Sequence, residues 1–389
     1  MTASSVKKQT LSFSTRGGLH DKMGDTIVKD HSARNFSMDL SGDELWRLRL
    51  THSKEAIPYS EGLELTPVNA NRSDLGHKKV SVVGCGQVGM AIAYAMLNQT
   101  VAGTIALVDQ NRSKLEGEAK DLEQGSAFHQ NVRILASDDY SATQNSHLVI
   151  ITAGAAQKPG ESRLSLVERN VNIMSSIMPK VMTFSPNAAI CIVSNPCDVM
   201  TAVAAKIAGP SVPPGRIFGS GTCLDSSRLR SLIAKSLGDI DTSAVSGYVI
   251  GEHGDSSVPV WSSVHVGGVP LLKVGQGPSE MHLQMHKKVV DSAYDVIEKK
   301  GYTNWAVGLT GAYIANAVLD DTRQIMPVST CVRGLKGITN DVFLSMPAGI
   351  GSTGVRRVVD IPLTQSELEA FKRSAQAVWD VQRGVWNNL

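Results

Sequence analysis

Apolar residues occur from Lys78 onward in short runs that alternate with longer segments of helical periodicity. Five runs are rich in β-branched residues and short enough to be buried strands, and the segments between them can hold crossover helices. The predicted strands are Val80–Val83, Thr104–Val108, Val132–Leu135, Leu148–Thr152 and Ala188–Val193. This order predicts an α/β fold with a parallel, doubly wound sheet.

The rhythm changes after about residue 220, where helical segments are mixed with strand-like pieces. These pieces are Val245–Ile250, Val258–Val266 and Val342–Val359. A capping box at Thr364–Glu367 then precedes a helix with one apolar face, formed by Leu368, Phe371, Ala375 and Val378. We therefore expect a first domain at 77–220 and a second, α+β domain at 221–389.

Residues 1–76 are polar and show no sustained period, so we expect a flexible extension outside the core fold. Their first twenty residues contain Lys7, Lys8 and Arg16 but no acidic residue, as in organelle transit segments, and a disordered tail is an equal alternative. A small apolar patch around Leu45–Leu50 could dock on the core or on a neighbouring subunit.

Composition favours a small-molecule substrate over a macromolecular partner. The 38 basic and 36 acidic residues nearly cancel, which gives no broad footprint for nucleic acid or an anionic membrane. No apolar run is long enough to span a bilayer, and no secretory signal is evident. The five cysteines lack CxxC spacing, so we expect neither disulfides nor a metal site. The expected location is cytoplasmic, or organellar if residues 1–76 are a transit segment.

A GxGxxG loop follows the first predicted strand and opens a helix. Its residues are Gly84, Cys85, Gly86, Gln87, Val88 and Gly89. Glycines at this spacing let backbone amides approach a pyrophosphate, although plain strand-to-helix turns share the motif. Asp109 ends the next strand, 25 residues after Gly84, near the position of an acid that binds the adenosine ribose. Its alternative role is a helix N-cap. Since a carboxylate repels a 2′-phosphate, we expect NAD as the cofactor of a Rossmann domain.

Four further stretches carry reactive side chains. Residues 152–163, TAGAAQKPGESR, form a loop after a strand, where ligands bind in doubly wound folds, and we expect a mobile lid. Asn195 follows another strand and could meet a ligand or only form a turn. Asp225 and Arg228 share one helical face in LDSSRLR, which a surface ion pair would also explain. His253, in GEHGDSSVPVW, follows an apolar strand between glycines, where its ring is expected to face a cleft.

From about residue 78 to 389 the chain resembles the lactate and malate dehydrogenase family. The strings GxGxxG, TAGAxQKPGESR, SNPxDV, LDSSR, GEHGDSSVPVW and GYTxW occur in the family's order. The resemblance implies hydride transfer between NADH and a 2-keto acid, with His253 as the catalytic proton donor, Asp225 as its partner and Arg163 polarising the carbonyl. The implied substrate-binding residues are Gln157, Arg163, Asn195, Arg228 and Thr303. The implied cofactor-binding residues are Gly84, Gly86, Gln87, Val88, Gly89, Asp109, Thr152, Ala153, Gly154 and Asn195.

The resemblance also bears on the substrate and on assembly. Neutral Gln157 stands where a malate-specific member carries an arginine, and an unpaired second carboxylate in a closed pocket is costly. The expected reaction is therefore the interconversion of pyruvate and L-lactate, and the resemblance implies a homotetramer. A malate or other 2-keto acid dehydrogenase, and a non-catalytic nucleotide-binding protein on the same fold, are the alternatives. Ala156 departs from animal lactate-specific members, which carry an arginine there, and this removes one pyrophosphate contact.

Overall fold

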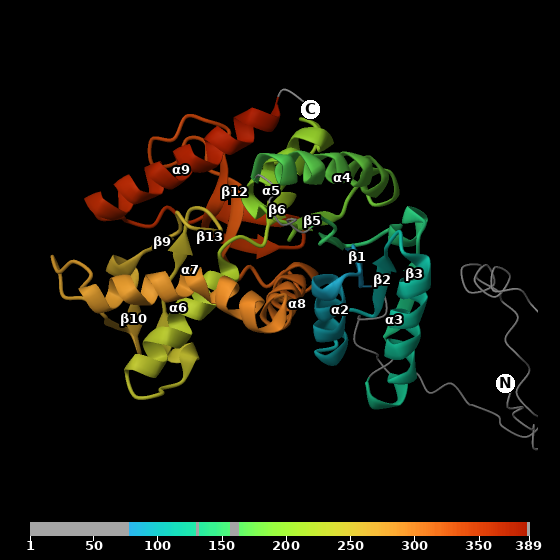
Figure 1. The fold of residues 1–389 in the computed structure, drawn as a ribbon, viewed down its shortest axis with the longest axis horizontal. Helices are drawn as coiled ribbons and strands as arrows, with labels where there is room; N and C mark the ends of the chain where they lie inside the picture. Colours follow the sequence, from blue (N-terminus) through green and yellow to red (C-terminus); the bar gives the residue numbers. More distant parts are fainter. Residues whose placement is uncertain (1–77, 130–131, 156–162, 387–389) are drawn as a thin grey trace, which may run out of the picture. The chain divides into compact units, whose positions relative to one another are not determined.

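A parallel sheet forms the centre of the computed structural model, which describes residues 78–129, 132–155 and 163–386 (Figure 1). Its parallel strands are β1 (Lys79–Val83), β2 (Thr104–Val108), β3 (Arg133–Ser137), β4 (Leu148–Ile151), β5 (Ala189–Ile192) and β6 (Ile217–Gly219). They lie in the order β3-β2-β1-β4-β5-β6, so the chain reverses direction across the sheet between β1 and β4. The five predicted strands are confirmed to within two residues. β6 was missed because three residues show no period.

Helices cover both faces of this sheet, as the doubly wound prediction requires. The helices that cover it are α2 (Gln87–Asn98), α3 (Arg112–Gln124), α4 (Arg163–Phe184), α5 (Cys197–Ala208), α8 (Trp305–Leu319) and α9 (Gln365–Trp386). Alternate residues of β4 point to opposite faces. Leu148 and Ile150 pack in the core cluster with α2, α3 and α8, while Val149 and Ile151 pack in the cluster with α4, α5 and α9.

Three C-terminal strands extend the same sheet beyond β6. They are β12 (Ile325–Cys331), β13 (Phe343–Gly351) and β14 (Gly354–Val358), all antiparallel, and β12 joins the sheet by pairing with β6. The predicted strand-like piece Val342–Val359 is thus a hairpin. Helices α6 (Cys223–Ser236) and α7 (Glu280–Lys300) pack in a separate apolar cluster that contains the buried Trp261. Short 3₁₀ turns occupy Ser126–Phe128, Tyr140–Thr143, Thr242–Ala244 and Trp261–Ser263.

The other two strand-like pieces are interrupted. They form only the two-residue strands β7 (Val245–Ser246), β8 (Val249–Ile250), β9 (Val258–Pro259) and β10 (His265–Val266), with β11 (Val269–Pro270) paired to β10. Ser262 explains one break, because its N–H and hydroxyl donate to the Glu367 carboxylate of α9 at 3.0 and 2.7 Å. A backbone turned toward α9 at this point cannot continue a strand.

The C-terminal helix confirms its predicted cap and apolar face. The Thr364 N–H donates to the Glu367 carboxylate, and the Glu367 N–H donates back to the Thr364 hydroxyl, at 2.8 and 3.3 Å. Phe371, Ala375 and Val378 are buried. In the described residues no helix is long and apolar enough to cross a bilayer.

The predicted domain boundaries stay predictions. The described residues all fall within one compact unit, which gives no test of a division at 220/221. The predicted extension, 1–76, lies outside the described residues.

Close packing of α2 against α8 generates a stability prediction. A Cβ at Gly308 would lie 2.7 Å from the Ala91 carbonyl oxygen, so Gly308→Ala should lower the free energy of unfolding by about 1–3 kcal/mol. Gly117→Ala in α3 is the matched control: its Cβ would meet nothing within 4 Å, and alanine there should stabilise by about 0.5–1 kcal/mol. Denaturant unfolding measures both, and equal effects would contradict the packing argument.

Candidate active site

The glycine loop joins β1 to α2 at the carboxyl edge of the sheet. Gly84 has φ +95°, and a Cβ there would lie 2.5 Å from the backbone nitrogen of Ala153. A Cβ at Gly89 would lie 2.0 Å from the Gly84 carbonyl oxygen. The chain's own packing therefore requires these two glycines.

Gly86 differs from the other two glycines, because a Cβ at this position would meet no atom within 4 Å. It is also the N-cap of α2, which has no side-chain cap and no acidic residue in its first turn. An open backbone at the positive end of a helix fits a pyrophosphate group. In that first turn Gln87 is exposed and Val88 is half-buried.

Asp109 faces the glycine loop rather than capping a helix. Its Oδ2 accepts the Cys85 N–H at 2.7 Å, and its Oδ1 accepts the Asn111 N–H at 2.9 Å. The N-cap of α3 is Asn111, which accepts the Lys114 N–H at 3.2 Å. The alternative interpretation of Asp109 as the N-cap is therefore wrong, and its role at the adenosine ribose stays a prediction.

The loops after β4 and β5 meet the glycine loop at the same edge. The Thr152 hydroxyl donates to the Gly84 carbonyl at 2.5 Å. Buried Asn170 of α4 joins the two loops, since it accepts the Ala155 N–H at 2.7 Å and donates to the Asn195 carbonyl at 2.9 Å. The Asn195 side chain is exposed, as is Gly154. The predicted cofactor-binding residues therefore follow four neighbouring strands, β1, β2, β4 and β5.

One carboxylate connects the two charged groups predicted to meet the substrate. His253 Nδ1 lies 2.6 Å from Asp225 Oδ2, and Arg228 Nη1 donates to Asp225 Oδ1 at 2.9 Å. The side chain of Asp225 is only 8% exposed. The ion pair expected as an alternative for Asp225 and Arg228 is present, but the same carboxylate also holds the histidine. One N–H of the guanidinium binds Asp225, out of five that a guanidinium carries.

The electrostatic setting favours a protonated imidazole. Burial lowers the pKa of His253. The charge and hydrogen bond of Asp225, together with the charge of Asp198, raise it by more than this, so the pKa is raised to about 9 overall. For the acidic Asp225, burial acts in the opposite direction and raises the pKa, yet His253 and Arg228 hold this pKa below its ordinary value. The pair is therefore an imidazolium and a carboxylate at neutral pH.

Three successive backbone N–H groups fix the loop that carries His253. The acceptors for residues 251, 252 and 253 are, in order, the Ser345 carbonyl of β13 (2.9 Å), the Ser374 hydroxyl of α9 (2.8 Å) and the Asp198 carboxylate of α5 (2.7 Å). Sequence reasoning missed these acceptors, together with Asn170. Asp198 belongs to the SNPxDV string, but no spacing shows that it reaches a backbone 55 residues further on.

Some predicted site residues cannot be placed fully. Gln157 lies outside the described residues, and Arg163 begins α4 but its side chain is likewise outside them. Thr303 is half-buried in the segment between α7 and α8. Their predicted roles stay predictions.

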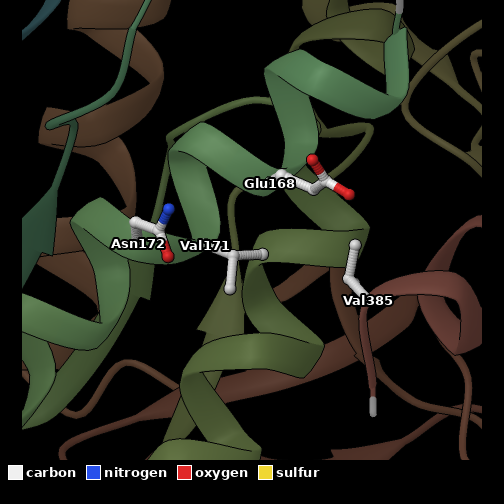
Figure 2. A pocket seen from close by; sticks show the side chains of 4 residues that line it. All are labelled: Glu168, Val171, Asn172 and Val385. Atoms are coloured by element: carbon white, nitrogen blue, oxygen red, sulfur yellow. The ribbon is translucent and has the colours of Figure 1, made fainter. Parts of the chain in front are cut away.

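A hollow of about 330 Å³ lies elsewhere, between α4 and α9 (Figure 2). It is lined by Glu168, Val171, Asn172 and Val385. None of the residues discussed above lines it, and Glu168 is the one titratable side chain among the described residues that line it. We assign the chemistry to the carboxyl edge of the sheet instead.

Comparison with known proteins agrees with this geometry. The model of the lactate/malate dehydrogenase NAD-binding domain matches residues 78–219, and that of the family's alpha/beta C-terminal domain matches residues 222–381.

Curated relatives are similar over nearly their whole length. The L-lactate dehydrogenase B-B chain of Danio rerio is 47% identical over 326 residues, which cover 82% of this chain and 97% of the relative. The B chains of Squalus acanthias and Homo sapiens are 46% and 45% identical, again over 82% of this chain and over 96% and 97% of their own. With the glycine loop and the histidine–carboxylate pair in place, the chain belongs to the lactate/malate dehydrogenase family, whose members are oxidoreductases that use a nicotinamide dinucleotide.

Proposed function

We propose that this chain is an NAD-dependent L-lactate dehydrogenase that reversibly reduces pyruvate. The observation that carries the proposal is the Asp225 carboxylate bound to both His253 and Arg228. A 2-keto acid needs a proton donor for its carbonyl and a cation for its carboxylate, and this arrangement supplies both. The L-lactate dehydrogenases similar to this chain support the assignment.

In this mechanism the protonated His253 donates its Nε2 proton to the substrate carbonyl oxygen, because Asp225 occupies Nδ1. Asp225 fixes the ring orientation and stabilises the imidazolium. Arg228 binds the substrate carboxylate through its remaining N–H groups as a charge-assisted fork. Arg163 polarises the carbonyl as charge develops on its oxygen. The glycine loop would hold the dinucleotide, which would supply the hydride, and lactate oxidation would reverse these steps.

We propose NAD rather than NADP because of Asp109. Its carboxylate is fixed by the backbone amides of Cys85 and Asn111, so it cannot easily turn away from a nucleotide at the glycine loop. A fixed carboxylate there accepts hydrogen bonds from the ribose hydroxyls and repels a 2′-phosphate.

The choice of pyruvate rests on Gln157, which lies outside the described residues. The alternative substrate is oxaloacetate, whose second carboxylate would face a neutral amide. An unpaired carboxylate in a closed site costs several kcal/mol. The names of the similar dehydrogenases favour lactate over malate.

We also propose self-association into the homotetramer implied by the family resemblance. Large side chains on α8 are exposed at four-residue spacing, namely Trp305 (62%), Leu309 (58%) and Tyr313 (47%). Tyr94 of the adjoining α2 is 55% exposed. Contiguous exposed aromatic and apolar groups are typical of protein interfaces.

Cofactor preference is tested by kinetics with both dinucleotides. The wild-type kcat/KM should favour NADH over NADPH by about 100-fold, and Asp109→Ser should reduce this to about 10-fold or less. Asp121→Ser, on the exposed face of α3, is the control and should leave the ratio unchanged. An equal preference for both cofactors in the wild type would contradict the proposal.

Substrate and catalytic group are tested by NADH oxidation with pyruvate and with oxaloacetate. Pyruvate should be favoured by about 100-fold in kcat/KM, and Gln157→Arg should reverse the preference.

His253→Ala should lower kcat by about 10²–10⁴-fold while NADH binding persists. His147→Gln is the control, because this exposed histidine precedes β4 at the opposite edge of the sheet. Turnover of neither acid by the wild type would favour a binding protein.

Assembly is tested by light scattering of the full chain. The expected mass is about four times the 41.5 kDa of one chain, and the double variant Leu309→Glu, Tyr313→Glu should lower it by burying charge in the interface. Val274→Glu, at an exposed valine away from α8, is the control. A wild-type monomer would overturn the proposal.

A further inference from the structure

We propose that Asp198 is a positioning residue for the reaction: it holds the backbone of His253 and places a second buried negative charge near the imidazole. This inference deepens the proposed dehydrogenase function and rests on His253 as its proton donor. It assigns a role to a residue that the motif analysis had left without one.

The geometry of Asp198 carries the inference. The residue lies in the first turn of α5 and is 2% exposed. Its Oδ2 accepts the His253 N–H at 2.7 Å, and its Oδ1 accepts the Ser329 hydroxyl of β12 at 2.6 Å. Both donors are neutral. A buried carboxylate without a cationic partner is costly, and among the described groups the imidazolium of His253 is the cation it attracts.

The two carboxylates near His253 act from different sides of the residue. Asp225 binds the ring nitrogen, whereas Asp198 binds the backbone N–H of the same residue. If Asp198 served only to fix the loop, a neutral acceptor would suffice, since the Ser374 hydroxyl does this at the adjacent N–H. The negative charge is the feature that a purely structural role leaves unexplained.

The other charged or titratable groups that bear on this pair lie on α5, α6, α7 and the loop of His253. Arg228 of α6 lowers the pKa of His253. Burial lowers the pKa of His286 of α7, and the charge of Asp225, not that of Asp198, opposes this effect. The charge of His253 lowers the pKa of Asp198, and the charge of Glu252 in the same loop raises it. Cys197, on α5 itself, stays a thiol, because burial and then the charge of Asp198 raise its pKa to about 12.

Asp198 is itself ionised under the conditions of the reaction. Burial raises its pKa to about 6, against the lowering effect of its hydrogen bonds from Ser329 and His253. The carboxylate is therefore charged at neutral pH and above, where the imidazole titrates. A charge at this position stabilises the proton-bearing ring.

The test compares pH profiles in both reaction directions. In the wild type, pyruvate reduction needs the imidazolium and should fall as pH rises through about 9, while lactate oxidation should rise over the same range. Asp198→Asn keeps the size but removes the charge: the amide oxygen can still accept the His253 N–H, and the amide nitrogen can donate to the Ser329 hydroxyl. The midpoints of the pH profiles for pyruvate reduction and for lactate oxidation should then both move to lower pH by about one unit, because one negative charge has been removed near the ring.

Ser374→Ala is the matched control. It removes the hydrogen bond to the neighbouring Glu252 N–H without changing any charge. We expect a lower kcat with the wild-type midpoints. Asp198→Ser removes the same charge with a smaller polar side chain and should shift the midpoints as Asp198→Asn does, which guards against misfolding of one variant.

A direct readout separates this inference from the proposed function. Titration of the His253 ring by NMR, in histidine-labelled full-length protein and assigned with His253→Ala, needs no turnover of pyruvate. A lower midpoint in Asp198→Asn supports the inference. Unchanged midpoints in both charge-deleted variants, by kinetics and by NMR, would overturn it, whereas absence of pyruvate turnover in the wild type would overturn only the proposed function.

Discussion

The buried carboxylate of Asp225 is the interaction on which the rest of the site depends. It contacts the ring nitrogen of His253 and the guanidinium of Arg228 at once. Removing a carboxylate and its cationic partners from water is costly. Hydrogen bonds on both oxygens of the Asp225 carboxylate offset this cost. The same contact favours a protonated imidazole and orients a cation beside it, so one side chain positions both groups that the proposed mechanism uses.

A single sheet carries both the glycine loop, after β1, and the helix of this carboxylate, after β6. The parallel strands place the glycine loop and the Asn195 loop at one edge, where ligands of doubly wound folds bind. The antiparallel hairpin of β12 and β13 then continues the sheet and supplies Ser329 and Ser345. Since three successive amides before and at His253 donate to three different elements, the imidazole is fixed by tertiary structure and not by its own short strand.

Much of this arrangement could be predicted from sequence, and the failures have physical causes. Buried parallel strands such as Thr104–Val108 are continuous apolar runs, which the printed sequence shows directly. The piece Val258–Val266 is equally apolar, but bonds from Ser262 to Glu367 of α9 interrupt it. Asp198 and Asn170 act through contacts with distant backbone, which no local pattern records. For Gln157 the sequence gives a prediction that the described residues do not test.

The most direct test of the roles proposed for His253 and Arg228 is a crystal structure of the protein with NADH and oxamate, a non-reacting analogue of pyruvate. The account predicts that His253 Nε2 lies within about 3 Å of the oxamate carbonyl oxygen while Nδ1 keeps its contact with Asp225. It also predicts that Arg228 binds the oxamate carboxylate through two N–H groups. An analogue seated beside the nicotinamide ring but out of reach of His253 would contradict it.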